Sequence, residues 1–244
     1  MANIALLTAA GSGSRMHQDI PKQFLTVNER PVIVYTLEAF QRHPEIDAIA
    51  VVCLEGWEQI LTAYARQFNI TKLNYIIPGG QTGQDSIRNG VFELEKHFAP
   101  DDMIIIHDGN RAFLEAWVIS DNIRVARKHG NAIAAVPCTE VVMETEDGIS
   151  SDTTHQRERL RRTQTPHAFR VKDICDLHRE ALKAGITNTA ASCELIVKVR
   201  KNNSVGSGQI FFSKGSEKNI KLTTVEDIDI FKALLSTERS SWLK

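Results

Sequence analysis

The sequence predicts an α/β fold built on a doubly wound, mostly parallel sheet. Short apolar runs bounded by polar or turn residues predict buried strands at residues 4–8, 47–53, 73–77, 102–107 and 132–136. Helical patterns lie between several of these runs. Alternation of strand and helix is typical of parallel sheets with helices on both faces. A chain of 244 residues fits one large domain or two small ones.

The helices are predicted from apolar residues that recur every three or four positions. Such stripes occur at residues 57–68 and 87–98, and each set falls on one helix face. The same spacing recurs at residues 174–181 and 228–235, which predicts two later helices.

The stretch between these two groups has a different composition. Residues 138–163 carry many charged and Thr residues and no long apolar stripe, which predicts an excursion from the core. Asp147-Gly148 favours a tight turn, so we expect a β-hairpin arm there.

Charge and cysteine content exclude several classes of protein. There are 29 Lys+Arg against 30 Asp+Glu, which argues against a generally basic nucleic-acid coat but leaves room for a local phosphate-binding patch. The four cysteines form no CxxC pair, so we expect neither a zinc ribbon nor a disulfide scaffold, and we expect a cytoplasmic protein. No apolar run approaches the ~20 residues of a membrane span, and the N-terminus does not resemble a signal peptide.

The first candidate site is the glycine-rich segment 6–16, which follows the first strand. A small turn there lets backbone N–H groups approach a phosphate. A dinucleotide fingerprint would need a third glycine where Met16 stands, and the Gly-Lys-Ser/Thr ending of a P-loop is absent. Arg15 and Lys22 would add two cations beside the turn, although each taken alone is more typical of a solvated surface residue.

The second candidate is the loop that begins at Gly79-Gly80. Its backbone, together with the Ser86 hydroxyl at the start of a predicted helix, offers groups that read the edge of a base. The alternative is that the glycines only form a turn and Ser86 is a helix N-cap.

Asp108 falls just past the carboxyl end of the predicted strand 102–107. Ligands of open α/β sheets bind at that edge, and one carboxylate with triphosphate oxygens is a usual way to hold Mg²⁺. The alternative is that Asp108 caps the following turn. Phosphate-type loops at two other strand ends favour the metal role.

Basic residues also gather in two later segments. Lys221 lies on a short β-like run before Thr224, an expected helix N-cap, and is placed to reach a phosphate. The other segment suits an anionic ligand, but most of its arginines are expected to be solvated; they are Arg157, Arg159, Arg161 and Arg162.

Taken in order, these segments resemble one family. The motifs are, in order, AAGSGSRM with PKQF, GG with DS, HDGNR, QTP with Phe169, and NIK with TT and ED. Together they are similar to those of the sugar-alcohol-phosphate cytidylyltransferases, over about residues 4–235. The resemblance implies a single Rossmann-like nucleotidyltransferase domain with a protruding arm at about 138–163, through which a homodimer forms. It implies that CTP and a polyol phosphate give a CDP-polyol and pyrophosphate, with Mg²⁺.

The resemblance also implies roles for individual residues. It makes Arg15 and Lys22 stabilisers of the transition state and puts Asp108 near the metal and the phosphates. Arg157, Thr165 and Lys221 match positions that hold the acceptor phosphate, the first two often across the dimer. The matching positions around the nucleotide are Thr8, Ala9, Ala10, Gly11, Gly13, Gly80 and Ser86.

The chain departs from the family pattern mainly on the acceptor side. The unexpected residues are Gln81, Gly83, Ala112, Val141 and Lys218, and an expected acid is missing from segment 187–192. The reaction is therefore better supported than the acceptor. Phe113, the arm turn and the Thr223-Thr224 pair favour ribitol 5-phosphate, for synthesis of teichoic acid, capsule or lipopolysaccharide. The alternatives are the methylerythritol phosphate enzyme of isoprenoid synthesis and a non-catalytic nucleotide-binding paralogue.

Overall fold

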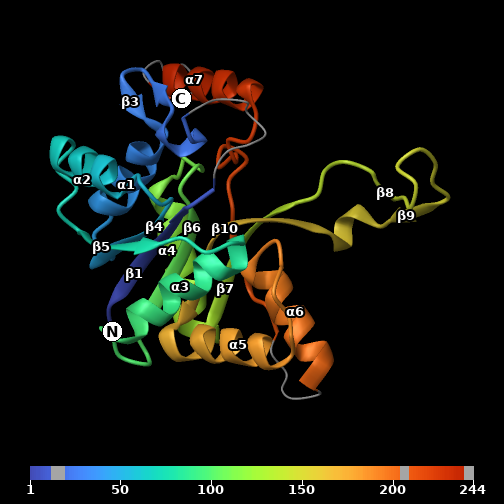
Figure 1. Ribbon diagram of the computed structural model, residues 1–244. Helices are drawn as coiled ribbons and strands as arrows, with labels where there is room; N and C mark the ends of the chain where they lie inside the picture. The colour runs from blue at the N-terminus through green and yellow to red at the C-terminus, as the bar shows by residue number, and fades with distance from the viewer. Residues whose placement is uncertain (12–19, 204–208, 239–244) are drawn as a thin grey trace.

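A computed structural model describes residues 1–11, 20–203 and 209–238. Its central sheet has seven strands in the order β11-β7-β10-β6-β1-β4-β5 (Figure 1). Their bounds are β1 Asn3–Ala9, β4 Ala48–Cys53, β5 Leu73–Pro78, β6 Met103–Asp108, β7 Asn131–Pro137, β10 Arg161–Arg170 and β11 Phe212–Lys214. All neighbouring pairs are parallel except those of β10. The doubly wound, mostly parallel sheet is therefore confirmed.

The strand β10 was not expected from the sequence. It lies antiparallel between β6 and β7, and it includes residues 161–163, which the sequence assigned to the arm. The strand begins with exposed arginines and becomes buried only from Gln164 onward, so its first residues resemble a charged loop.

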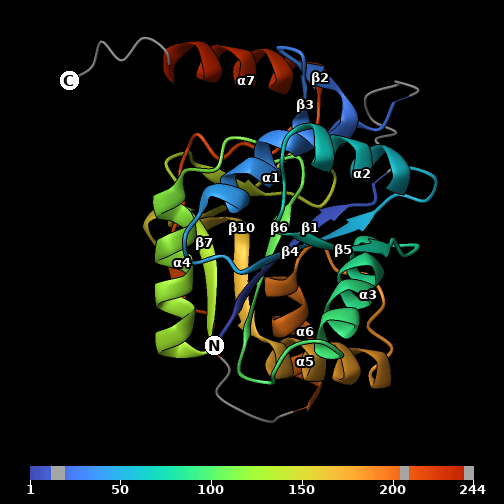
Figure 2. The ribbon, with the colours of Figure 1, turned by 90° about the vertical axis from the view of Figure 1, so that its left-hand side faces the viewer.

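Six helices cover the two faces of the sheet (Figure 2). The bounds are α1 Val32–Arg42, α2 Glu58–Gln67 and α4 Ala116–His129 on one face, and α3 Gly83–Glu95, α5 Val171–Lys183 and α6 Ser192–Asn203 on the other. Within β1, Ala5 and Leu7 point into the first layer and Ile4 and Leu6 into the second. This alternation explains why the strand is apolar throughout.

A smaller apolar cluster lies beyond the carboxyl edge of the sheet. Here α7 (Val225–Glu238) packs near the hairpin of β2 (Thr26–Val27) and β3 (Arg30–Pro31), and Phe231 contacts a cluster that includes Phe113 and Leu222. The predicted cap is confirmed: the Asp227 amide donates to Thr224 Oγ1 at 3.4 Å. Within the described ranges, no helix has the length and apolar character required to cross a membrane.

The arm projects away from the body of the molecule (Figure 1). It contains β8 (Val142–Glu144), β9 (Thr153–His155) and the 3-10 turn η3 (Arg157–Arg159). The hairpin was expected, but the prediction of a tight Asp-Gly turn was wrong, because residues 145–152 separate the two strands. Asp147 instead organises a wider loop, since its Oδ1 accepts the amides of Ile149 and Ser150, both at 2.8 Å.

Candidate active site

The candidate site lies where the order of the parallel strands reverses. The chain passes from β1 to β4 and β5 on one side of β1, and then returns to β6 on the other side. The register places Thr8 of β1 directly opposite Asp108 of β6 at the carboxyl edge. Open α/β sheets bind ligands at this switch point.

The end of β1 and the η2 turn (Lys22–Phe24) form one wall of a cavity of about 190 Å³. Lys22 and the predicted nucleotide-binding residues Thr8, Ala9, Ala10 and Gly11 all line it. The Gln23 side chain is buried, and its Nε2 donates to the carbonyls of Ala9 at 2.7 Å and Gly11 at 3.1 Å. Gln23 thus fixes the segment that carries Lys22 against the end of β1. Gly13 and Arg15 lie outside the described residues.

The Gly79-Gly80 loop approaches other backbone closely. A Cβ at Gly80 would lie 2.4 Å from the Asp85 Cβ, so only glycine fits there without displacing α3. The N-cap of α3 is Thr82, not Ser86, and it forms a capping box with Asp85. Ser86 lies one turn inside the helix, and its Oγ accepts the Gly80 amide at 3.0 Å. The hydroxyl therefore shapes the loop, and Ser86 also lines the cavity.

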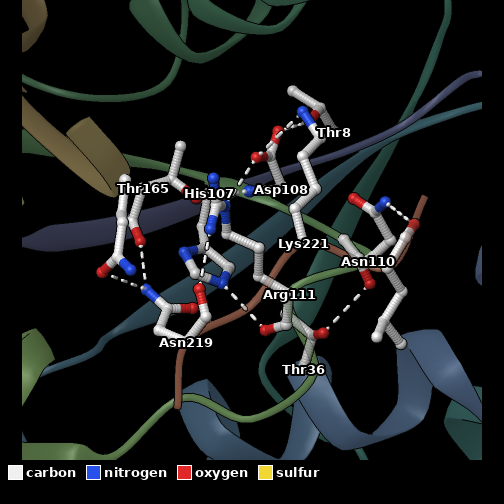
Figure 3. Close-up of polar contacts among 12 residues, drawn as sticks. Thr8, Thr36, His107, Asp108, Asn110, Arg111, Thr165, Asn219 and Lys221 are labelled. Carbon is white, nitrogen blue, oxygen red and sulfur yellow. Dashed lines mark hydrogen bonds and ion pairs between the residues drawn. The ribbon is translucent and has the colours of Figure 1, made fainter. Parts of the chain in front are cut away.

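Asp108 is the centre of a polar network (Figure 3). Its Oδ2 lies 3.0 Å from Arg111 Nε and 3.2 Å from Lys221 Nζ. Burial opposes ionisation of this carboxyl, but the ammonium of Lys221 and the guanidinium of Arg111 outweigh that cost and hold the pKa of Asp108 below its ordinary value. Asp108 is therefore a carboxylate at neutral pH. Lys221 does not lie on a strand, as the sequence suggested, but in an irregular segment before α7.

The donor set at Asp108 fits a magnesium ion that binds together with a triphosphate. The Oδ1 atom contacts the Thr8 hydroxyl at 3.5 Å, whereas both cations contact Oδ2. Among the residues that the structure describes, no three His, Cys, Asp or Glu side chains gather into a metal-binding group. Mg²⁺ characteristically takes one or two carboxylates and completes its shell with phosphate oxygens and water. Asp108 would be its protein ligand here.

The structure separates the two residues expected to hold the acceptor phosphate with Lys221. Thr165 belongs to the network, since its Oγ1 accepts the Asp108 amide at 3.1 Å. It lines an adjoining cavity of about 210 Å³, which Asp108 and Lys221 also line. Arg157 lies on the exposed arm, where its Nη1 donates to the Thr139 carbonyl at 3.1 Å, and it lines neither cavity.

Two residues of the network, Arg111 and Asn219, were given no individual role by the sequence analysis. Arg111 joins Asp108 to the Lys221 segment, because its Nη1 donates to the Asn219 carbonyl at 2.7 Å. The only sequence signal for Arg111 and Asn219 is their place in the HDGNR and NIK motifs.

The segment that lacks the expected acid is held to α3 by neutral groups. Gln84 Nε2 donates to the Ile186 carbonyl at 2.6 Å, and Gln84 Oε1 accepts the Thr189 hydroxyl at 3.1 Å. Without the expected acid, and with glycine at position 83, the cavity wall on this side is formed by neutral groups that are hydrogen-bonded to one another.

His178 lines the same cavity and gives a prediction about pH. It is buried, neither ring nitrogen has a hydrogen-bond partner among the described residues, and burial lowers its pKa to about 4. The unfolded chain binds more protons at this residue between about pH 4 and 6.5, so acid favours unfolding there. We expect His178→Leu to reduce the pH dependence of the free energy of unfolding by about 1.4 kcal/mol per pH unit in this range. Urea titrations of both proteins at pH 5, 5.5 and 6 test this, and an equal pH dependence of the free energy of unfolding in the two proteins contradicts it.

The chain matches the family model described as 2-C-methyl-D-erythritol 4-phosphate cytidylyltransferase over residues 3–237. A solved structure from Anaerococcus prevotii, described as 4-diphosphocytidyl-2C-methyl-D-erythritol synthase, has a TM-score of 0.80 and 28% identity and covers 96% of both chains.

Curated relatives carry two kinds of name. Ribitol-5-phosphate cytidylyltransferase of Lacticaseibacillus paracasei is 39% identical over 95% of this chain and 97% of its own. 2-C-methyl-D-erythritol 4-phosphate cytidylyltransferase of Clostridium botulinum is 34% identical over 96% of this chain and 97% of its own. The switch-point site and this similarity along nearly the whole chain agree, and the chain belongs to the 2-C-methyl-D-erythritol 4-phosphate cytidylyltransferase family.

Proposed function

We propose that this protein transfers CMP from CTP to a polyol phosphate and releases pyrophosphate, with ribitol 5-phosphate as the acceptor. The observation that carries the reaction is the cavity at the switch point, which brings together the backbone-rich end of β1, Lys22, Asp108 and Lys221. Glycine-rich turns and cations at a strand end suit a triphosphate.

The mechanism requires positioning and charge neutralisation more than covalent chemistry. An oxygen of the acceptor phosphate attacks the α-phosphorus of CTP in line, and pyrophosphate leaves. Because the attacking oxygen is already anionic, no general base has to accept a proton. Lys22, and Arg15 by the family pattern, stabilise the charge on the transferring phosphoryl group, while Lys221 and Thr165 hold the acceptor.

We further propose that Mg²⁺ binds at Asp108 with the phosphates of CTP, where it would neutralise their charge. Binding requires an ionised carboxylate, and Lys221 and Arg111 keep Asp108 ionised because they hold its pKa below the ordinary value. We also propose a cytoplasmic homodimer in which the arm carries Arg157 to the site of the partner subunit. The isolated position of Arg157 on an exposed arm supports this arrangement.

The choice of acceptor depends on identity to relatives. The Lacticaseibacillus paracasei ribitol-5-phosphate enzyme is 39% identical and a second, from Vibrio parahaemolyticus, is 38% identical, against 34% for the Clostridium botulinum methylerythritol phosphate enzyme. The family model itself supports 2-C-methyl-D-erythritol 4-phosphate as the second candidate.

Pyrophosphate release with a panel of substrates tests the proposal. We expect turnover with CTP and ribitol 5-phosphate, little with 2-C-methyl-D-erythritol 4-phosphate, and little with ATP, because the two backbone-rich loops are expected to read a pyrimidine edge and to exclude the larger purine. Reactions without acceptor give the background. Equal turnover with ATP would overturn the CTP assignment. If CTP binds by calorimetry but no acceptor is consumed, the non-catalytic alternative is supported.

A further inference from the structure

The Lys221 ammonium contacts the Asp108 carboxylate, although the segment that contains Lys221 has no regular secondary structure. Residues 215–224 form neither helix nor strand, and the Lys221 side chain is 42% exposed. A lysine in such a segment ordinarily samples many rotamers. Its ammonium nevertheless lies 3.2 Å from Asp108 Oδ2 (Figure 3). The backbone on both sides of Lys221 is bonded to groups outside the segment.

The first of these attachments is at Asn219, two residues before Lys221. Asn219 is fully buried, and its Nδ2 donates to the Thr165 carbonyl at 2.7 Å. Its own carbonyl accepts Arg111 Nη1 at 2.7 Å. This side of the segment is thus attached to β10 and to the end of β6.

The second attachment is made by Asn110, which holds the residue after Lys221. Its Nδ2 donates to the Leu222 carbonyl at 2.5 Å, and its own carbonyl accepts the Leu222 amide at 3.0 Å. Asn110 is buried, and Leu222 is packed in the cluster with Phe231. Both backbone groups of Leu222 are therefore bonded to a single asparagine.

We propose that Asn110 and Asn219 form a two-sided clamp that positions Lys221 for the acceptor phosphate. Both are positioning residues, because they act on the reaction through Lys221. The proposal rests on the proposed function, since it assumes that Lys221 binds the acceptor. It assigns to Asn110 a role that neither the HDGNR motif nor the family relationship specified.

The physical basis is preorganisation. Ordering a long side chain during binding costs conformational entropy, and fixing its backbone beforehand reduces that cost. Losing the clamp should therefore weaken acceptor binding about three- to tenfold, the range expected for immobilising one such side chain. Asn110 also lines the cavity assigned to CTP, but its amide is bonded to the Leu222 carbonyl. CTP binding should therefore change less than acceptor binding, because the end of β1 keeps its own support from Gln23.

The test compares Asn110→Ala with Asn3→Ala. Asn3 is also buried, and its Nδ2 donates to the Glu45 carbonyl at 2.6 Å, but it lies at the opposite end of β1 from Thr8. Asn110→Ala should raise the KM for the acceptor about three- to tenfold, with the KM for CTP changed less than about twofold. Asn3→Ala should leave both constants unchanged. Asn110→Leu, which keeps the bulk without the amide, covers the case in which the alanine variant fails to fold.

A double-mutant cycle separates positioning from a merely structural role. In a Lys221→Ala background, Asn110→Ala should have no further effect on the KM for the acceptor, because the group it positions is gone. Additive effects would overturn the proposal, as would an increase in the KM for CTP alone, which would mean that Asn110 contacts the nucleotide directly.

Acceptor binding is also measured directly, by calorimetry with ribitol 5-phosphate in the presence of a non-hydrolysable CTP analogue. If the parent protein binds or turns over no polyol phosphate, the proposed function fails. If the parent binds the acceptor and Asn110→Ala binds it equally well, only the clamp fails.

Discussion

Replacement of Lys22 by alanine is expected to lower kcat for CMP transfer by on the order of 10²–10³, the usual loss for removing one preorganised charge-stabilising group. Lys22 lines the cavity beside Thr8, and the next residue, Gln23, bonds to the carbonyls of Ala9 and Gly11. The backbone next to Lys22 is therefore fixed before the reaction, so less of the lysine has to be ordered in the transition state. The KM values should change much less than kcat, because the interaction is strongest in the transition state.

Steady-state pyrophosphate release at saturating CTP and acceptor measures this effect. Lys96→Ala is the matched control, since Lys96 is an exposed lysine whose Nζ lies 2.6 Å from Glu93 on the surface of the molecule. Both variants should unfold at nearly the temperature of the parent protein, since neither residue belongs to the apolar core. An unchanged kcat for Lys22→Ala would reduce Lys22 to an ordinary surface residue.

Replacement of Arg157 by alanine should raise the KM for the polyol phosphate by about 10², because a guanidinium fork is lost from a phosphate. The KM for CTP should hardly change. Arg159→Ala, in the same exposed turn η3, is the control and should behave like the parent protein. If Arg159→Ala has an equal effect, general attraction of anions by the arm explains the result better than a specific contact.

Mixing the two defective proteins tests whether the site is shared between subunits. In a heterodimer of Arg157→Ala and Lys22→Ala chains, one site receives Lys22 and Arg157 from intact parts of different chains. Random exchange of equal amounts should therefore restore about a quarter of the sites. If no activity recovers after verified subunit exchange, Lys22 and Arg157 of the same chain serve the same site. This outcome would contradict the proposed sharing of the site, which rests on Arg157 being exposed and lining neither cavity.

Local pattern was sufficient for the parallel core and for the polar residues at its carboxyl edge. Strands such as residues 102–107 are apolar throughout because both faces of the sheet are covered, and this pattern is readable without a structure. The cavity position of the end of β1 and of Asp108 at the end of β6 follows from strand ends alone, since parallel strands place their carboxyl ends at one edge. The ordered motifs also indicate the family.

Tertiary structure decided the parts that depend on residues distant in sequence. The strand β10 is polar at its start and is recognisable only from its pairing with β6 and β7. Ser86 resembles an N-cap locally, yet its hydroxyl bonds to Gly80 because the preceding loop folds back onto α3. Asp108 and Lys221 are 113 positions apart, and the Asn110 clamp bonds to a residue 112 positions away. No short-range pattern encodes such pairs, because they form only when packing of the sheet and α7 brings the segments together.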